Sequence, residues 1–216
     1  TVIEVSRMDK PQKGRVVIEK SGEIFQSVSE SEGVYQPIFQ TSMLKGAIFQ
    51  ITAAEDIITP DGTVRIKKGE VADTVTTDEK GKAKSRELYL GKYKIEETTV
   101  PYGMVRLGEP HKVEISYAGE AVEVTETTAE IYNERQRLQI DLVKTLEKDD
   151  VFGIGGHNEI EEVRFGLYAK EELKAGDGKV IPKDGLLEIA TCDKEGKAIF
   201  KTDIPVGAEL YVKEYS

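Results

Sequence analysis

Three residues far apart in the sequence, Lys20, Glu97 and Asn133, have the side-chain types needed to form a covalent bond between two strands. A neutral lysine amine is a nucleophile, and the carbonyl carbon of a side-chain amide can be attacked. In an apolar core, loss of water favours the neutral amine and the protonated carboxyl group. Such a carboxyl group would hydrogen-bond the amide oxygen and transfer protons while the amine displaces ammonia. The product would be an amide between Lys20 and Asn133, formed once per chain and without a cofactor.

Each of these residues closes a short segment in which apolar and polar residues alternate, as in a half-buried β-strand. The segments are 15–20, 93–97 and 129–133, and the lysine, the glutamate and the asparagine fall on the apolar side. A lone buried ammonium costs several kcal/mol. The phase therefore predicts three strands of one core whose last residues meet.

Each residue alone also has an ordinary interpretation. Lys20 would then bury only its aliphatic stem and keep its ammonium group in water. Glu97 would be an exposed residue beside Glu96, and Asn133 would cap a turn. The bond is favoured because all three residues share the same phase.

Composition limits the possible functions. The 216 residues contain 40 acidic and 30 basic side chains, a net charge of −10, which argues against nucleic acid as a partner. No apolar run reaches the roughly 18 residues of a membrane span. One cysteine and two histidines leave no disulfide within the chain and no zinc set, so we expect no metal and no cofactor.

Turn sequences separate many short strand-like segments, and no helical period is sustained. This pattern predicts an all-β fold of tandem sandwich domains, similar to immunoglobulin-like domains. Residues 21–45 fit the pattern least well, and we expect them to form an excursion packed on the first sandwich.

The second half of the chain repeats the first. Residues 49–53 match 165–169, and residues 77–83 match 192–198. Lys144 and Glu214 lie on the apolar side of their segments, as Lys20 and Glu97 do. We expect them to form a latent second pair that has no acceptor.

We therefore expect a complete sandwich over 15–136 and a second one over 137–216 that lacks its final strand. Residues 1–14 would be a linker and the closing strand of a preceding repeat. Asp9, which precedes Lys20 by the spacing that separates Asn133 from Lys144, would be the acceptor of that repeat.

Several stretches carry a family resemblance: Gly46–Phe49, Thr77–Gly81, Leu90–Thr98 and Pro101–Gly103. In order and spacing they resemble the Cna B-type, or SpaA-type, domains of Gram-positive surface adhesins and pilins, over 15–216 as two units. The resemblance implies a prealbumin-like β-sandwich and a spontaneous isopeptide bond from Lys20 to Asn133 assisted by Glu97. One departure is that Gly207–Glu214 is one residue longer than Gly91–Glu97, which affects the placement of Glu214.

The resemblance also implies a biological setting. Such domains build stalks that hold a binding tip away from the cell wall, which implies an extracellular, wall-anchored protein whose partners are neighbouring repeats. A host matrix protein or glycan would be bound by a separate tip. The alternative is a module that itself binds such a ligand. A conventional enzyme is disfavoured, because no Ser, His or metal constellation has catalytic spacing.

Overall fold

The computed structural model describes residues 10–106, 108–146 and 159–215. The chain divides into two compact units. Unit 1 contains residues 1–22 and 41–134, and unit 2 contains residues 23–40 and 135–216. Asp9, the expected acceptor of a preceding repeat, lies outside the described residues.

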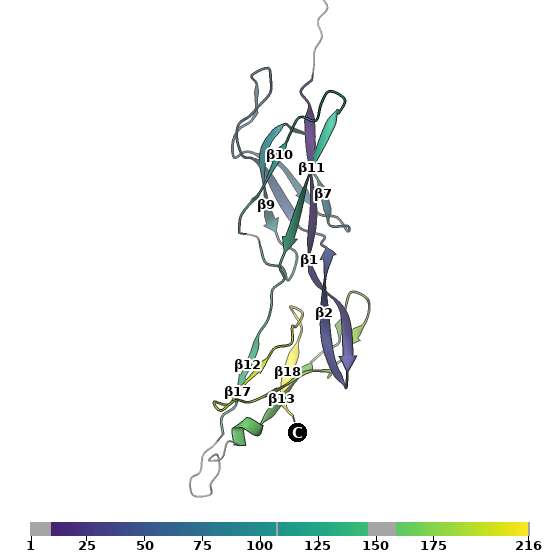
Figure 1. Cartoon of the computed structure of the whole chain (residues 1–216), viewed down its shortest axis with the longest axis vertical. Coiled ribbons are helices and arrows are strands. Elements are labelled where there is room, and N and C mark those ends of the chain that lie inside the picture. Colours follow the sequence, from purple (N-terminus) through teal and green to yellow (C-terminus); the bar gives the residue numbers. More distant parts are fainter. Residues whose placement is uncertain (1–9, 107, 147–158, 216) are drawn as a thin grey trace, which may run out of the picture. The chain divides into compact units, whose positions relative to one another are not determined.

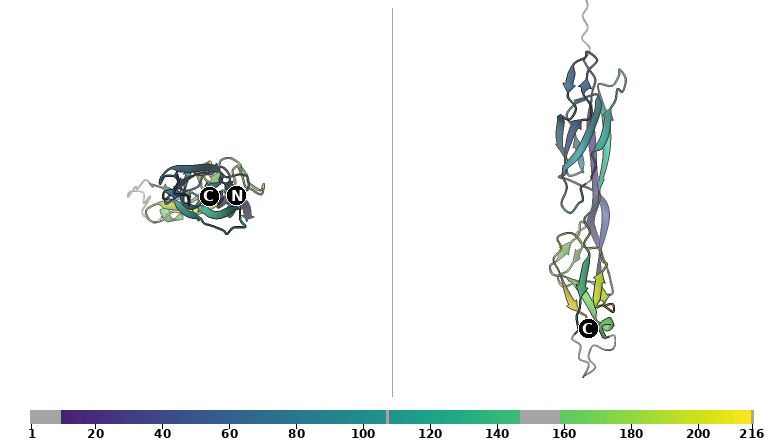
Figure 2. Two further views of the ribbon diagram at one scale, coloured as in Figure 1. Left: turned by 90° about the horizontal axis from the view of Figure 1, so that it is seen from above. Right: turned by 90° about the vertical axis from the view of Figure 1, so that its left-hand side faces the viewer.

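Unit 1 is a sandwich of two sheets (Figures 1 and 2). One sheet is built on the first half of β1 (Lys13–Ser31), which pairs with β11 (Val124–Asn133), β7 (Lys82–Lys84) and β8 (Leu88–Tyr89). The other has the order β10 (His111–Ile115), β9 (Gly91–Thr99), β3 (Ile48–Ala53) and β6 (Val71–Thr76). A small ribbon joins β4 (Ile57–Ile58) to β5 (Val64–Ile66).

The core of unit 1 follows the alternation seen in the sequence. Val16 and Ile18 of β1 are fully buried, and Ala129 and Ile131 of β11 are 1% and 3% exposed. Strands β1 and β11 run parallel, with Lys20 opposite Ile131. Because side chains of neighbouring strands in register share a face, the last inward residues of both strands point into one core.

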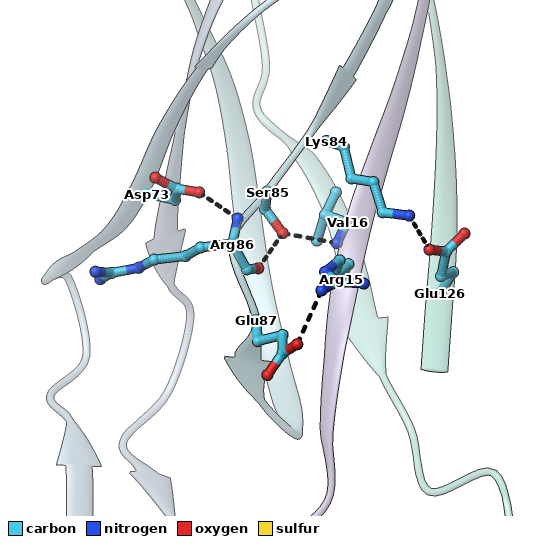
Figure 3. A network of polar contacts seen from close by, with 8 residues as sticks. All are labelled: Arg15, Val16, Asp73, Lys84, Ser85, Arg86, Glu87 and Glu126. Carbon is cyan, nitrogen blue, oxygen red and sulfur yellow. Dashed lines mark hydrogen bonds and ion pairs between the residues drawn. The ribbon is translucent and has the colours of Figure 1, made fainter. Parts of the chain in front are cut away.

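Polar contacts hold β1 from both sides (Figure 3). Ser85 receives a hydrogen bond from the Val16 amide through its Oγ at 2.9 Å and donates its own amide to the Val16 carbonyl at 2.9 Å. Arg15 forms an ion pair with Glu87 at 2.8 Å. These contacts fix the register of the first half of β1, which contains Lys20.

Unit 2 contains strands that match those of unit 1. Its larger sheet has the order β2 (Val34–Met43), β16 (Leu186–Thr191), β13 (Arg164–Ala169) and β18 (Leu210–Glu214). β12 (Ile140–Val143) pairs with β17 (Lys197–Phe200), and β14 (Leu173–Lys174) with β15 (Val180–Ile181). A single 3-10 turn covers Glu159–Glu162.

The turns that begin at Asp78 and Asp193, which match in sequence, have the same hydrogen bonds. Asp78 Oδ1 accepts from the amides of Lys80 and Lys82, both at 2.9 Å. Asp193 Oδ1 accepts from the amides of Glu195 and Lys197, at 3.0 and 2.8 Å. The described residues of unit 2 contain no strand equivalent to β10 or β11.

The excursion over 21–45 corrects one expectation. Residues 23–40, the second half of β1 and most of β2, belong to unit 2 and not to the first sandwich. The physical reason is apolar burial: Val28 is 7% exposed within the core of unit 2, and Phe25 and Tyr35 pack against that core. The unit boundaries therefore differ from 15–136 and 137–216, because unit 2 is discontinuous in sequence.

Two features are absent from the described residues, a membrane-spanning helix and a metal-binding group of side chains. No helix there is long and apolar enough to cross a membrane. No group of three or more His, Cys, Asp or Glu side chains there is arranged to hold a metal ion.

Candidate functional site

Lys20, Glu97 and Asn133 are all buried in the core of unit 1. Lys20 and Asn133 have no exposed surface, and Glu97 is 5% exposed. Lys20 comes from β1 and Asn133 from β11 of one sheet, whereas Glu97 comes from β9 of the other. Asn133 Nδ2 donates a hydrogen bond of 2.6 Å to Glu97 Oε2. The structure thus brings together the three residues singled out by the sequence.

The lysine amine is held beside the acceptor strand. Lys20 Nζ donates to the carbonyl of Ile131 at 3.4 Å and to that of Ser21 at 3.1 Å. In the parallel register Lys20 lies opposite Ile131, and Asn133 is two residues further along on the same face. A lysine side chain that reaches the Ile131 carbonyl is directed along β11 towards Asn133.

Burial makes Lys20 a better nucleophile. Loss of water lowers the pKa of Lys20 from 10.5 to about 8, although the nearby charge of Glu97 opposes this shift. At pH 7 the neutral amine is then about a tenth of the total, roughly 300-fold more than at the ordinary pKa. The site therefore supplies the reactive form at neutral pH.

The polar atoms of the site are incompletely paired. Glu97 Oε1 and Asn133 Oδ1 are buried without a hydrogen-bond partner among the described residues. An unpaired buried polar atom costs about 1–3 kcal/mol. The carboxyl group also faces the amide nitrogen and not the amide oxygen, which differs from the arrangement expected from the sequence. Glu97 is thus placed to deliver a proton to the leaving nitrogen.

A pocket of about 240 Å³ leads to the carboxyl group. Glu97, Phe49, Ile131 and His111 are among the residues that line it. Ammonia released at Asn133 would have a route out of the core through this pocket.

Unit 2 repeats the donor side of the site. Lys144 Nζ lies 3.4 Å from Glu214 Oε2, although the two side chains are 34% and 59% exposed. The Lys144 amide donates to the Gly196 carbonyl at 2.8 Å, just as the Lys20 amide donates to the Gly81 carbonyl at 2.8 Å. The described part of unit 2 has no strand beside β12 that would carry an acceptor.

Glycines that position the lysine were not recognised from the sequence as site residues. Gly81 has a φ of +67°, and a Cβ there would lie 2.6 Å from the Lys20 carbonyl oxygen. A Cβ at Gly22 would lie 2.8 Å from the Asn133 carbonyl oxygen. The recurrence of glycine at Gly81 and Gly196 in the two halves was the available signal.

The fold and the buried trio define a β-sandwich module, and comparison with known proteins finds one family model that matches part of the chain. Residues 39–130 match the SpaA family, described as a prealbumin-like fold domain. This part of the chain is thus similar to a SpaA-type prealbumin-like domain, and the match covers less than half of the chain. No curated protein matched the chain.

Among solved structures, the chain is similar to the Bacillus anthracis TIE protein, with a TM-score of 0.57 and 21% identity over 94% of this chain and 28% of that one. It is also similar to GBS52, the minor pilin of Streptococcus agalactiae, with 15% identity and a TM-score of 0.37. That match covers 64% of this chain and 48% of GBS52. The chain is also similar to a double-mutant form of the shaft pilin SpaA of Lactobacillus rhamnosus GG. The identity is 14%, the TM-score is 0.38, and the match covers 94% of this chain and 88% of that one. Only the first likeness exceeds a TM-score of 0.5, and it shows the fold. The chain spans about a quarter of that protein's length.

Proposed function

We propose that unit 1 forms an intramolecular isopeptide bond between Lys20 and Asn133, assisted by Glu97, and that the chain is a structural stalk module of a Gram-positive surface protein. The observation that carries the proposal is the buried contact of 2.6 Å between Glu97 and Asn133, with a fully buried lysine on the strand beside the asparagine. Such a group of polar residues in a core is costly unless it reacts or is fully paired.

The reaction balances without a co-reactant. The neutral Nζ of Lys20 attacks Cγ of Asn133, a C–N bond forms, and the bond from Cγ to Nδ2 breaks. Glu97 takes a proton from the attacking amine and gives it to the departing nitrogen, which leaves as ammonia. The new amide retains one N–H, which can donate to the Glu97 carboxyl group in place of the Asn133 nitrogen that leaves.

The position of the bond suits a load-bearing role. Because β1 and β11 are parallel, the start of β1 and the end of β11 lie at opposite ends of the pair, so a pull between them loads the ladder in shear. A bond from Lys20 to Asn133 would carry the force covalently and spare the 112 residues between them. Closing a loop of this size also constrains the unfolded chain, by about 5 kcal/mol on the disulfide scale.

We extend the proposal to the whole chain. Unit 2 would be a second domain of the same type, with Lys144 and Glu214 as its donor pair, and Asp9 would be the acceptor of a preceding repeat. The partners would be neighbouring repeats of an extracellular, wall-anchored protein. The SpaA family match and the hydrogen bonds shared by the two units support this interpretation.

The test is the mass of the intact chain under denaturing conditions. One bond removes one ammonia, about 17 Da, and we expect this loss in the wild-type chain. Asn133→Ala and Glu97→Ala should restore the unreacted mass, after correction for the substitution. Glu96→Gln, an exposed neighbour on the same strand, should still lose ammonia. An unreduced mass for the folded wild-type chain would refute the bond.

A further inference from the structure

The excursion between Lys20 and Leu44 leaves unit 1 and returns to the same place. The Leu44 amide donates a hydrogen bond of 2.8 Å to the Lys20 carbonyl. The intervening chain forms a hairpin of which residues 23–40 belong to unit 2. A direct turn from Lys20 to Leu44 would complete unit 1 equally well, so the hairpin needs another explanation.

Backbone contacts tie the hairpin to unit 2. The carbonyls of Phe25 and Gln26 accept from the amides of Gly176 and Asp177 at 3.0 and 2.9 Å. A Cβ at Gly176 would lie 2.7 Å from the Gln26 side chain, so the close approach depends on glycine.

The second strand of the hairpin extends the sheet of unit 2. Val34 pairs in parallel with Leu186 of β16, and Gln36 Nε2 donates to the Leu187 carbonyl at 3.0 Å. The hairpin therefore meets the edge of β16 at its first two residues, where backbone groups would otherwise be unpaired.

A buried arginine anchors the base of the hairpin. Arg135 is 8% exposed and lies 3.6 Å over the ring of Phe39. Its guanidinium forms ion pairs with Glu23 and Asp203. Glu23 and Phe39 belong to the hairpin, so the hairpin helps to pair and cover a charge that is buried in unit 2.

We propose that residues 23–40 are a clasp, a segment inserted into the sequence of the first sandwich in order to complete the second, and that residues 135–216 hold their native structure only with the clasp in place. Unit 2 obtains from it an edge strand, the buried Val28, and the contacts that Glu23 and Phe39 make with Arg135. Unit 2 is thus built from two stretches of the chain that are separated in sequence by residues 41–134. This inference does not depend on the isopeptide bond.

Cys192 provides a reporter for unit 2. It is the only cysteine of the chain, it is 4% exposed, and it lies in the core that contains Val28. Burial raises the pKa of its thiol, so that it reacts slowly while unit 2 is folded. The rate of thiol labelling then measures how often unit 2 opens.

The decisive variant replaces residues 23–40 by a short glycine turn in the otherwise complete chain. We expect the thiol of Cys192 to be labelled without denaturant, while unit 1 still loses about 17 Da. A thiol that remains as protected as in the wild-type chain would overturn the clasp. If no variant, including the wild type, loses ammonia, the proposed bond fails while the labelling result still decides the clasp.

A point variant covers the case in which the deletion also disturbs unit 1. Val28→Ala removes two buried methyl groups from the clasp and should raise the rate of Cys192 labelling by about tenfold or more. Ser29→Ala, at the exposed position next to Val28 on the same strand, is the matched control and should leave the rate unchanged. Equal rates for Val28→Ala and the wild-type chain would overturn the inference.

Discussion

Glu97→Gln, which removes the proton carrier but keeps the size of the side chain, should weaken unit 2 as well as unit 1. Unit 2 consists of residues 23–40 and 135–216, separated in sequence by residues 41–134. If the bond forms, the path from Glu23 to Arg135 runs through Lys20 and Asn133 and is only a few residues long. Without it, the shortest link between the two segments of unit 2 runs from Gln40 to Arg135 and contains the 94 residues 41–134 whenever unit 1 is unfolded.

The size of the effect follows from loop closure. The entropy cost rises as (3/2)RT ln n, so lengthening the path from about 5 to about 94 residues costs about 2.5 kcal/mol at 25 °C. This corresponds to a roughly 70-fold increase in the opening equilibrium of unit 2. The increase should be seen only at denaturant concentrations that unfold unit 1, because the folded pair β1 and β11 holds the two ends together in either case.

Labelling of Cys192 across a urea series measures this coupling. In Glu97→Gln we expect the thiol to become reactive together with the unfolding of unit 1. In the wild-type chain and in Glu96→Gln it should stay protected to higher urea. If Glu97→Gln lacks the bond and yet protects Cys192 as well as the wild type does, the bond has no influence on unit 2 and the reasoning is wrong.

Three further predictions concern the bond itself. Because the pKa of Lys20 is about 8, the rate of bond formation after refolding from denaturant, followed by mass, should rise about tenfold per pH unit below pH 8 and level off above it; a rate that does not change with pH below pH 8 would show that the neutral amine does not limit the reaction. Gly81→Ala should slow the bond by at least about tenfold, because a side chain at this left-handed position collides with the Lys20 carbonyl; an unchanged time course would contradict this role. Asn133→Asp should still react and lose water, about 18 Da in place of 17; a chain that keeps its full mass would show that the amide is required.

The alternation of short strands was enough to predict both the fold class and the trio. In the segments that end at Lys20, Glu97 and Asn133 one face is buried, and a shift by one residue would place every apolar side chain on the wrong face. A polar residue that continues the apolar face of such a strand is therefore predicted to lie on the buried face as well. The same phase predicted the pairing of Lys144 with Glu214, which lie within 3.4 Å.

The clasp could not be predicted in the same way. Its partners in unit 2 begin at Arg135, after 94 intervening residues, and no local sequence pattern identifies them. Phe25, Tyr35 and Phe39 indicate that the segment is packed, but not against which core. The direction of the Glu97 carboxyl group was also missed, because strand phase places a residue on a face and does not orient its terminal atoms.

The place of the bond connects these two findings. Lys20 lies three residues before the clasp begins at Glu23, and Asn133 lies two residues before unit 2 resumes at Arg135. A bond elsewhere along β1 and β11, for instance between Val16 and Thr127, would crosslink unit 1 but leave longer free ends at the entry to unit 2. At Lys20 and Asn133, one amide closes unit 1 and also joins the two segments of unit 2 at their bases. If the bond forms, force arriving along β1 would pass into unit 2 across this amide, while the clasp, inside the spared loop, would carry no load and would keep unit 2 folded.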